Sequence, residues 1–385
     1  MLSHAKSRTA TLQSRMRDLG IDRAVFTDES SIAYLAGFWG YLGIEFGRPS
    51  MLIVDAYDAP TVITPLMESE MVSAMTWIDD IRKWEDFGAN SWARALGSVL
   101  GDSPTSIWIE RDHIPAIVRN FLDETYPSTP LENISPILGA QRMIKSDFEI
   151  NIMKQAGEIA GAMMAAAHNS LTTGAQEFES ALAVIDAGSR KAATFLTDTG
   201  WERFVSPMIH NLQILQSGRD ASMVHRRASV KRYEKFDPVY FCFCNMAQFK
   251  QYKLGFDRMF HIEDVSDQGE RVQLAAIDAQ QAAISTIKPG IRASDVAAAA
   301  NAIYAERGYE TGYRTGRSIG VSYLEAPELK TGDDTILLAG MTFAVDGGIS
   351  IDGSTAGRIG DSIVVTDTGF EYLTNYPREI LLSKS

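Results

Sequence analysis

QSGRDASMVH (216–225) opens the stretch of sequence that decides the fold, and VYFCFC (239–244) and YKLGFDRMF (252–260) complete it. The two apolar, aromatic runs are typical of strands, and we expect them to pair as a hairpin. His225 stands alone in the loop before them, and Asp257 lies near the end of the second strand. A histidine and a carboxylate brought together on rigid strands can act as base and acid. A lone histidine is more often a structural residue, however, and Asp257 also fits a surface ion pair with the arginine that follows it.

The whole-chain figures are those of an ordinary globular protein. With 385 residues, 45% hydrophobic and 22% charged, the sequence predicts two domains with sizeable cores. The net charge of −13 argues against nucleic acid and anionic membranes as partners, because phosphate binding draws on clustered lysine and arginine. The N-terminus lacks an apolar signal core and no run of roughly eighteen apolar residues occurs, so we expect a cytoplasmic protein without a membrane segment.

The only two cysteines, Cys242 and Cys244, lie two residues apart on the first predicted strand. Alternate residues of a strand point to the same face. This spacing suits neither an ordinary structural disulfide nor a zinc site, which needs more ligands. We expect both to be small core residues in a reducing compartment.

The first part of the chain alternates strands with helices. We expect strands at 22–27, 51–54, 61–64 and 106–110, and helices at 5–20, 31–37, 65–75, 90–100 and 113–124. Such alternation predicts an α/β layer domain over residues 1–140.

The second part of the chain is rich in predicted helices. Ser146 is a suitable N-cap for a long helix, with Glu149 three residues on as its capping-box partner. Further helices are expected at 174–196, 268–287 and 293–308. A histidine near the end of the Ser146 helix, His168, complements the helix dipole and is assigned no chemistry.

The chain resembles the creatinase and proline-aminopeptidase superfamily, the pita-bread enzymes, and within it the creatinase branch. Gln-Ser-Gly at 216–218, with His225 at the matching spacing, and Phe-Gly-Arg-Pro at 46–49 both match creatinase. Ile-Lys-Pro-Gly at 287–290 matches the superfamily. The resemblance implies an α+β two-domain fold, with a creatinase-like α/β domain at 1–140 and a pita-bread catalytic domain at 141–385.

The same resemblance bears on metal binding. The metal-dependent members have five metal ligands, and the matching positions of this chain are Cys244 or Asn245, Gly255, Arg317, Asp346 and Gly360. One carboxylate cannot hold a hard or borderline divalent cation, and Arg317 puts a positive charge where the metals would lie. We therefore predict no metal and no other cofactor, which argues against metal-activated water.

The resemblance also implies roles for three side chains. His225 would be general base and then general acid, activating water and protonating the departing nitrogen. Asp257 and Asp346 would grip a cationic group of the substrate. The residues alone leave a plainer interpretation of Asp346, since the glycine pair at 347–348 is also the pattern of a turn at the end of a strand.

Four further residues complete the predicted substrate site. By itself, Gly-Arg-Pro predicts a turn with a solvated arginine; the resemblance implies that Arg48, beside Phe46, enters the site of a second subunit and holds the substrate carboxylate. This role requires a homodimer. Tyr252 and Arg317 are the other two. The sequence leaves open whether Arg317 points into the cavity or caps a helix, and whether His210 lines the cavity.

The sequence is compatible with several functions, and the expected partner is a small-molecule substrate. The first is metal-independent hydrolysis of a carbon–nitrogen bond in a guanidino- or amidine-type carboxylic acid. Both creatinase glutamates are aspartates here, so creatine itself is not the expected substrate. The alternatives are an Xaa-Pro aminopeptidase- or dipeptidase-like metallopeptidase, a lyase of the same fold acting on a small cationic acid such as dimethylsulfoniopropionate, and a binding protein without activity.

Overall fold

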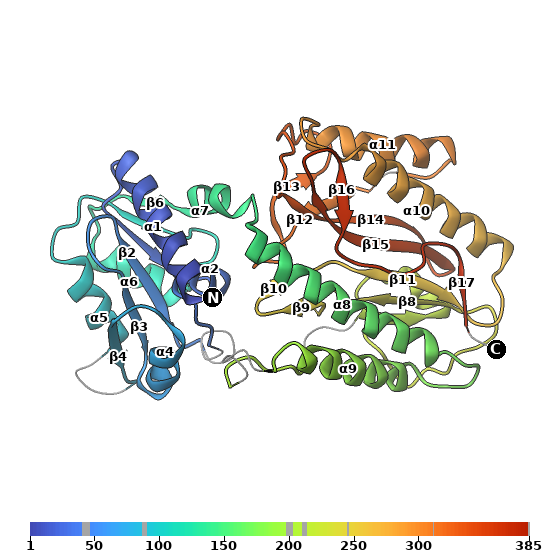
Figure 1. The fold of residues 1–385 in the computed structure, drawn as a ribbon, viewed down its shortest axis with the longest axis horizontal. Helices are drawn as coiled ribbons and strands as arrows, with labels where there is room; N and C mark the ends of the chain where they lie inside the picture. Colours follow the sequence, from blue (N-terminus) through green and yellow to red (C-terminus); the bar gives the residue numbers. More distant parts are fainter. Residues whose placement is uncertain are drawn as a thin grey trace. The chain divides into compact units, whose positions relative to one another are not determined.

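The computed structural model describes residues 1–40, 47–86, 91–197, 203–209, 214–244, 246–310 and 312–383 (Figure 1). They divide into two compact units, Met1–Gln141 and Arg142–Ser385, and each is described here by itself. Three residues named from the sequence, Phe46, His210 and Asn245, lie outside the described residues. None of the described helices combines the length and the apolar composition needed to span a lipid bilayer.

The first unit is a six-stranded mixed sheet with helices, in the strand order β4-β3-β2-β1-β5-β6. The strands are β1 (Arg23–Phe26), β2 (Met51–Asp55), β3 (Thr61–Pro65), β4 (Asp80–Trp84), β5 (Ile107–Ile109) and β6 (Leu131–Asn133). The helices are α1 (Leu2–Asp18), α2 (Glu29–Ala36), η1 (Leu66–Glu68), α4 (Ser69–Met75), α5 (Trp92–Leu100), α6 (Ala116–Thr125) and α7 (Ser135–Arg142), which ends across the boundary. Strand residues such as Val25 and Ile53 pack against Leu96 and Leu122 of the helices, so the predicted α/β layering is confirmed.

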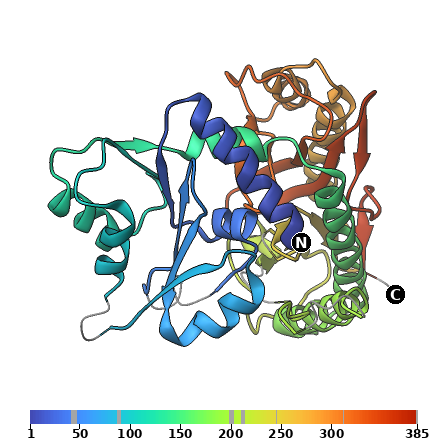
Figure 2. The same ribbon diagram turned by 60° about the vertical axis from the view of Figure 1, so that its left-hand side comes forward.

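The second unit is built on a nine-stranded sheet with the central order β13-β12-β14-β15-β11-β8-β7. Its strands are β7 (Ile214–Ser217), β8 (Pro238–Cys242), β11 (Asp257–His261), β12 (Gly316–Ser318), β13 (Glu325–Leu329), β14 (Thr342–Ile351), β15 (Thr355–Val365), β16 (Phe370–Tyr372) and β17 (Leu381–Leu382). Its helices are α8 (Asp147–Asn169), α9 (Glu177–Thr194), η2 (Gly218–Ser222), α10 (Asp267–Thr286) and α11 (Ala293–Glu306). Helices α8 and α9 lie side by side, as do α10 and α11 (Figure 2).

The predicted hairpin forms, but its second strand is shorter than expected. β8 pairs antiparallel with β11, and Asp257 lies opposite Cys242. The run 252–260 is not one strand, because β10 (Tyr252–Lys253) pairs with β9 (Gln248–Phe249) in a separate two-stranded sheet. Between them, the Gly255 N–H donates to the Ser362 hydroxyl at 3.0 Å. Asp257 therefore begins β11 and does not lie near its end.

The two glycines that follow Asp346 lie inside a strand, since β14 continues to Ile351. A Cβ atom at Gly347 would overlap the backbone of α10 at Ala276, and a Cβ atom at Gly348 would overlap the guanidinium of Arg358. Glycine is thus required at residue 347, where the obstacle is backbone, whereas the flexible Arg358 side chain can move away from residue 348. Because both glycines lie inside β14, the interpretation of 347–348 as a turn is wrong.

A buried ion cluster ties the sheet to α10 on the face opposite Asp257. Asp361 is fully buried and accepts from Arg258 Nη2 at 3.0 Å, Arg378 Nε at 3.0 Å, Thr374 Oγ1 at 2.9 Å and Gln280 Nε2 at 3.1 Å. Successive strand residues face opposite sides, which separates Arg258 from Asp257. The surface ion pair considered for these two neighbours is therefore wrong.

The capping box predicted for α8 is confirmed. Glu149 Oε2 accepts from the Ser146 N–H at 2.9 Å and from its hydroxyl at 2.8 Å. Ser146→Ala is expected to lower the free energy of unfolding by about 1 kcal/mol, because the N-cap oxygen is lost. Chemical denaturation checks this value. Ser146→Thr, which keeps the hydroxyl, should stay close to the parent, and equal losses in both variants would contradict the capping role.

Candidate active site

Two carboxylates converge on one face of the nine-stranded sheet. Asp257 of β11 and Asp346 of β14 both lie opposite Gly360 of β15, one from each side. Residues directly opposite each other in an antiparallel pair share a face. A Cβ atom at Gly360 would overlap Asp257 Oδ2 and lie 2.8 Å from Asp346 Oδ1. Both carboxylates thus reach over the bare glycine, and we call this side of the sheet the carboxylate face.

Asp257 is almost completely buried. Burial raises the pKa of Asp257 well above its usual range, and the neighbouring charge of Asp346 raises it further. Asp257 therefore keeps its proton at pH values where an exposed aspartate has lost it. A positive group placed between the two carboxylates would lower the pKa of Asp257 and so favour its ionised form.

The two oxygens of Asp346 have different surroundings. Oδ2 forms an ion pair with Arg317 Nη1 at 2.5 Å. Oδ1 is buried and accepts no hydrogen bond from any residue that the structure describes. A buried acceptor without a donor costs free energy, so Oδ1 is available to an N–H group of a ligand.

Arg317, on β12, lies on the carboxylate face, where it contacts Asp346. Its side chain is 4% exposed, and its guanidinium lies 4.3 Å from the centre of the Tyr323 ring. Burial acts to lower the pKa of Arg317, but the charge and hydrogen bond of Asp346 outweigh it and raise that pKa. Arg317 is therefore a fixed positive charge that orients Asp346.

The positions that match metal ligands in the resemblance lie together in space. Arg317 Nη2 is 3.7 Å from Cys244 Sγ and would be 3.0 Å from a Cβ atom at Gly255. Arg317 also pairs with Asp346, which reaches over Gly360. Across the described ranges, no group of three or more His, Cys, Asp or Glu side chains is arranged to hold a metal ion. The described residues therefore do not fit a metal centre, since a guanidinium lies where the ligands would converge.

His225 lies in an exposed turn that directly follows η2. Ala221 of η2 packs against Tyr240, Met259 and Ala356, which line the carboxylate face. Gln216 Nε2 donates to the backbone oxygen of Met223 at 2.6 Å and so holds the start of the turn. No hydrogen bond or ion pair joins the His225 ring to Asp257 or Asp346 in the described part of the chain. The structure thus brings the two carboxylates together and puts His225 on a turn at the same side of the sheet.

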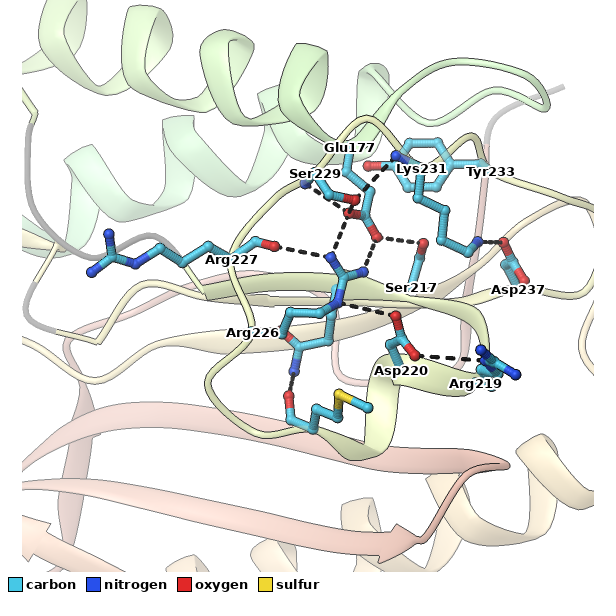
Figure 3. A network of polar contacts seen from close by, with 12 residues as sticks. Glu177, Ser217, Arg219, Asp220, Arg226, Arg227, Ser229, Lys231, Tyr233 and Asp237 are labelled. Atoms are coloured by element: carbon cyan, nitrogen blue, oxygen red, sulfur yellow. Dashed lines mark hydrogen bonds and ion pairs between the residues drawn. The ribbon is translucent and has the colours of Figure 1, made fainter.

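A buried glutamate that the sequence did not single out holds the other end of this turn (Figure 3). Glu177, in the first turn of α9, accepts from Arg226 Nη1 at 2.9 Å, from Ser217 Oγ at 2.7 Å and from Ser229 Oγ at 2.6 Å. Burial acts to raise the pKa of Glu177, but these hydrogen bonds outweigh it and lower that pKa. Glu177 is thus an ionised anchor for Arg226, the residue next to His225. Its distance along the chain from the turn explains why no local pattern reveals it.

The remaining predicted residues lie elsewhere. The Tyr252 hydroxyl donates to Glu149 Oε1 at 3.0 Å, which directs it to the start of α8. Arg48 belongs to the first unit, where it pairs with Asp86. It lines a cavity of about 350 Å³ whose other walls include Trp84. Its contact with a second subunit stays a prediction.

The sequence is similar to known families over most of its length. Residues 151–367 match metallopeptidase family M24, and residues 8–144 match the creatinase/prolidase N-terminal domain. Agropine synthesis cyclase of Rhizobium rhizogenes is 25% identical over 96% of each chain. Creatinase of a Bacillus species is 28% identical over 96% of this chain and 90% of its own. The crystal structure of dipeptidase PepE from Mycobacterium ulcerans superposes with a TM-score of 0.83 at 24% identity, covering 99% of this chain and 98% of that one.

Proposed function

The chain belongs to metallopeptidase family M24, and from its converging carboxylates we propose that it is a metal-independent hydrolase of a carbon–nitrogen bond in a small acid with a cationic nitrogen centre. The predicted superfamily and the predicted two-domain fold are confirmed. Relatives named as a creatinase and as a cyclase support an enzyme that is a hydrolase or a lyase. The narrower proposal, metal-independent hydrolysis of a carbon–nitrogen bond, depends on the residues of the candidate active site.

The observation that carries the proposal is the pair of carboxylates over Gly360. Asp346 Oδ1 is a buried acceptor that lacks a donor among the described residues, and Asp257 is a buried acid that ionises more readily beside a positive charge. A guanidinium or amidinium group supplies the donor that Oδ1 lacks, and its positive charge adds to those of Arg258 and Arg358 in favouring the ionised form of Asp257. Arg317 pairs with Asp346 through Nη1, and in this proposal it positions that carboxylate.

In this proposal His225 moves the protons. It takes a proton from water as the water attacks the carbon next to nitrogen, and it then gives that proton to the departing nitrogen. Histidine suits both steps because its ordinary pKa lies near neutrality. Its exposed turn is anchored on both sides, by Gln216 and by the contact of Arg226 with Glu177. Asp257 and Asp346 meanwhile hold the cationic group in place.

A substrate screen tests the proposal. Metal-stripped protein is incubated with guanidino acids, cyclic amidine acids such as ectoines, and amino-acid betaines, and the released amine, ammonia or urea is measured. We expect turnover of a member of this set that is insensitive to a chelator. Hydrolysis of Xaa-Pro dipeptides that requires added manganese would overturn the proposal in favour of a peptidase.

A lyase is distinguished by its product. Hydrolysis takes up the oxygen of water, so products formed in ¹⁸O-water gain the label at the cleaved carbon. Elimination leaves a new carbon–carbon double bond and no label. Labelled product is the expected result, and an unsaturated, unlabelled product would replace the hydrolase by the lyase alternative.

The raised pKa of Asp257 predicts how ligand binding depends on pH. The ionised form binds a cation, so affinity should rise with pH up to the pKa of Asp257 and level off above it. Below that pKa, each bound cation releases one proton and the affinity falls about tenfold per pH unit. Calorimetric titration of a cationic substrate analogue across pH measures this slope. Asp257→Asn should bind weakly at every pH, and an unchanged slope in that variant would assign the proton to another group.

A further inference from the structure

The two cysteines are in contact at the edge of the carboxylate face. Cys242 is the last residue of β8, and the chain turns directly after it, with the N–H groups of Met246 and Ala247 both donating to the Phe243 carbonyl. The turn brings the Cys242 thiol to 2.7 Å from Cys244 Sγ, to which it donates. Cys242 is 2% exposed, as expected for a core residue, whereas Cys244 is only partly buried and can be reached from solvent.

Cys244 Sγ accepts from three donors of different kinds. Besides the Cys242 thiol, the Tyr323 hydroxyl donates to it, and Arg317 Nη2 lies 3.7 Å away. A nearby cation and hydrogen-bond donors are the setting in which protein sulfur reacts with oxidants. The hydrogen bond to Cys244, together with burial, raises the pKa of Cys242 well above its usual range. Cys242 is therefore the proton-bearing partner and Cys244 the sulfur that an oxidant meets first.

We propose that Cys242 and Cys244 are a reversible redox pair, which a peroxide converts to one intrachain disulfide. The sulfur of Cys244 attacks the peroxide O–O bond, and with hydrogen peroxide this gives a sulfenic acid and water. The sulfur of Cys242 then attacks Cys244 Sγ, the S–O bond breaks, and a second water leaves with the Cys242 proton. In total, two thiols and one hydrogen peroxide give one disulfide and two waters. Two electrons pass from sulfur to oxygen, and a dithiol reductant reverses the change.

The backbone allows this bond. Residues two apart have Cα atoms at most about 7 Å apart, and a disulfide joins Cα atoms about 4.4–6.8 Å apart. The turn after Cys242 shortens the chain relative to full extension. This brings the Cα atoms of the two cysteines closer together, as a disulfide requires. Only a short approach of the two Sγ atoms from 2.7 Å is then needed. The expectation that both cysteines are core residues is confirmed for Cys242 and wrong for Cys244, which is only partly buried because β8 ends two residues before it.

Oxidation of the two cysteines would affect Asp346, one of the two carboxylates proposed to bind the cationic group of the substrate. Arg317 contacts both Cys244 and Asp346, so the loss of the Cys244 thiol changes the surroundings of the guanidinium that orients Asp346. We expect the disulfide form to have lower affinity for cationic ligands. This consequence rests on the proposed function, whereas the chemistry of the pair does not.

Thiol counting tests the pair directly, because the chain contains two cysteines in all. After treatment of the full chain with hydrogen peroxide, free thiols measured in denaturant should fall from two to zero per chain. The intact mass should drop by about 2 Da, a cross-linked peptide should carry both residues, and dithiothreitol should restore both thiols. Cys242→Ser and Cys244→Ser serve as matched controls, in which no mass loss within one chain is possible.

Two results would overturn the inference. One is separate oxygen addition to each sulfur without a cross-linked peptide, and the other is a disulfide found only between chains on a non-reducing gel. Cys244→Ser should also react with peroxide far more slowly than Cys242→Ser, and the reverse order would exclude Cys244 as the first sulfur attacked. A failed substrate screen leaves these measurements unaffected, so the two proposals fail separately.

Discussion

Asp361→Ala is expected to lower the free energy of unfolding by about 3–5 kcal/mol, the range for breaking a buried ion pair. Asp361 has no exposed surface, and Arg258, with which it pairs, is 1% exposed. Removal of the carboxylate leaves a buried guanidinium without its counter-charge, and it also removes one of the acceptors of Arg378 and of Gln280. Since Gln280 lies on α10, the loss removes one of the two hydrogen bonds by which its side chain joins the helix to the sheet.

Equilibrium denaturation in urea measures this loss. Asp361→Asn keeps the shape of the side chain and serves as the variant more certain to fold, with a smaller destabilisation in the same direction. The matched control is Asp186→Ala, whose partner Arg190 is exposed in an i, i+4 pair on α9, and no measurable change is expected there. Equal changes in the free energy of unfolding at the two positions would show that burial of the ion cluster does not add to stability.

His225→Ala is expected to reduce kcat by a factor of about 10²–10⁴, the contribution of a positioned general acid–base group. KM should change little, because Asp257 and Asp346, and not His225, are proposed to hold the cationic group. The measurement is steady-state kinetics on the substrate found in the screen. Imidazole added to the variant should restore part of kcat, which a merely structural histidine would not allow.

His113→Ala is the matched control for this variant. His113 is also exposed, lies in the first unit and makes its described hydrogen bonds through the backbone. Its replacement should leave kcat at the parent value. A His225→Ala protein with the parent kcat would remove the proposed base, and a protein that binds ligand but never turns it over would favour the binding-protein alternative.

The sequence predicted most of the first unit, and the strands it missed share one physical property. β4 and β6 are the two edge strands of the six-stranded sheet, and most of their side chains are not buried. Edge strands need no continuous apolar run, so hydrophobic pattern alone does not reveal them. The central strands β2 and β3 are almost wholly buried and were found.

In the site, the sequence predicted residue types better than their contacts. The acidic pair Asp257 and Asp346 was identified through the family resemblance, and the structure brings both over Gly360. The Arg317–Asp346 ion pair joins two strands far apart in sequence, and no local pattern encodes such a pairing. The same holds for Glu177, whose place under the His225 turn depends on how α9 packs.

If the site works without a metal, as proposed, Arg317 also determines how the site obtains its positive charge. A metal centre must be loaded from its surroundings, and it can be emptied by chelation or filled by a competing ion. The positive charge of Arg317 is joined to the backbone by covalent bonds and arrives with translation. Scarcity of trace elements cannot deplete it, and only a change in the gene can exchange it.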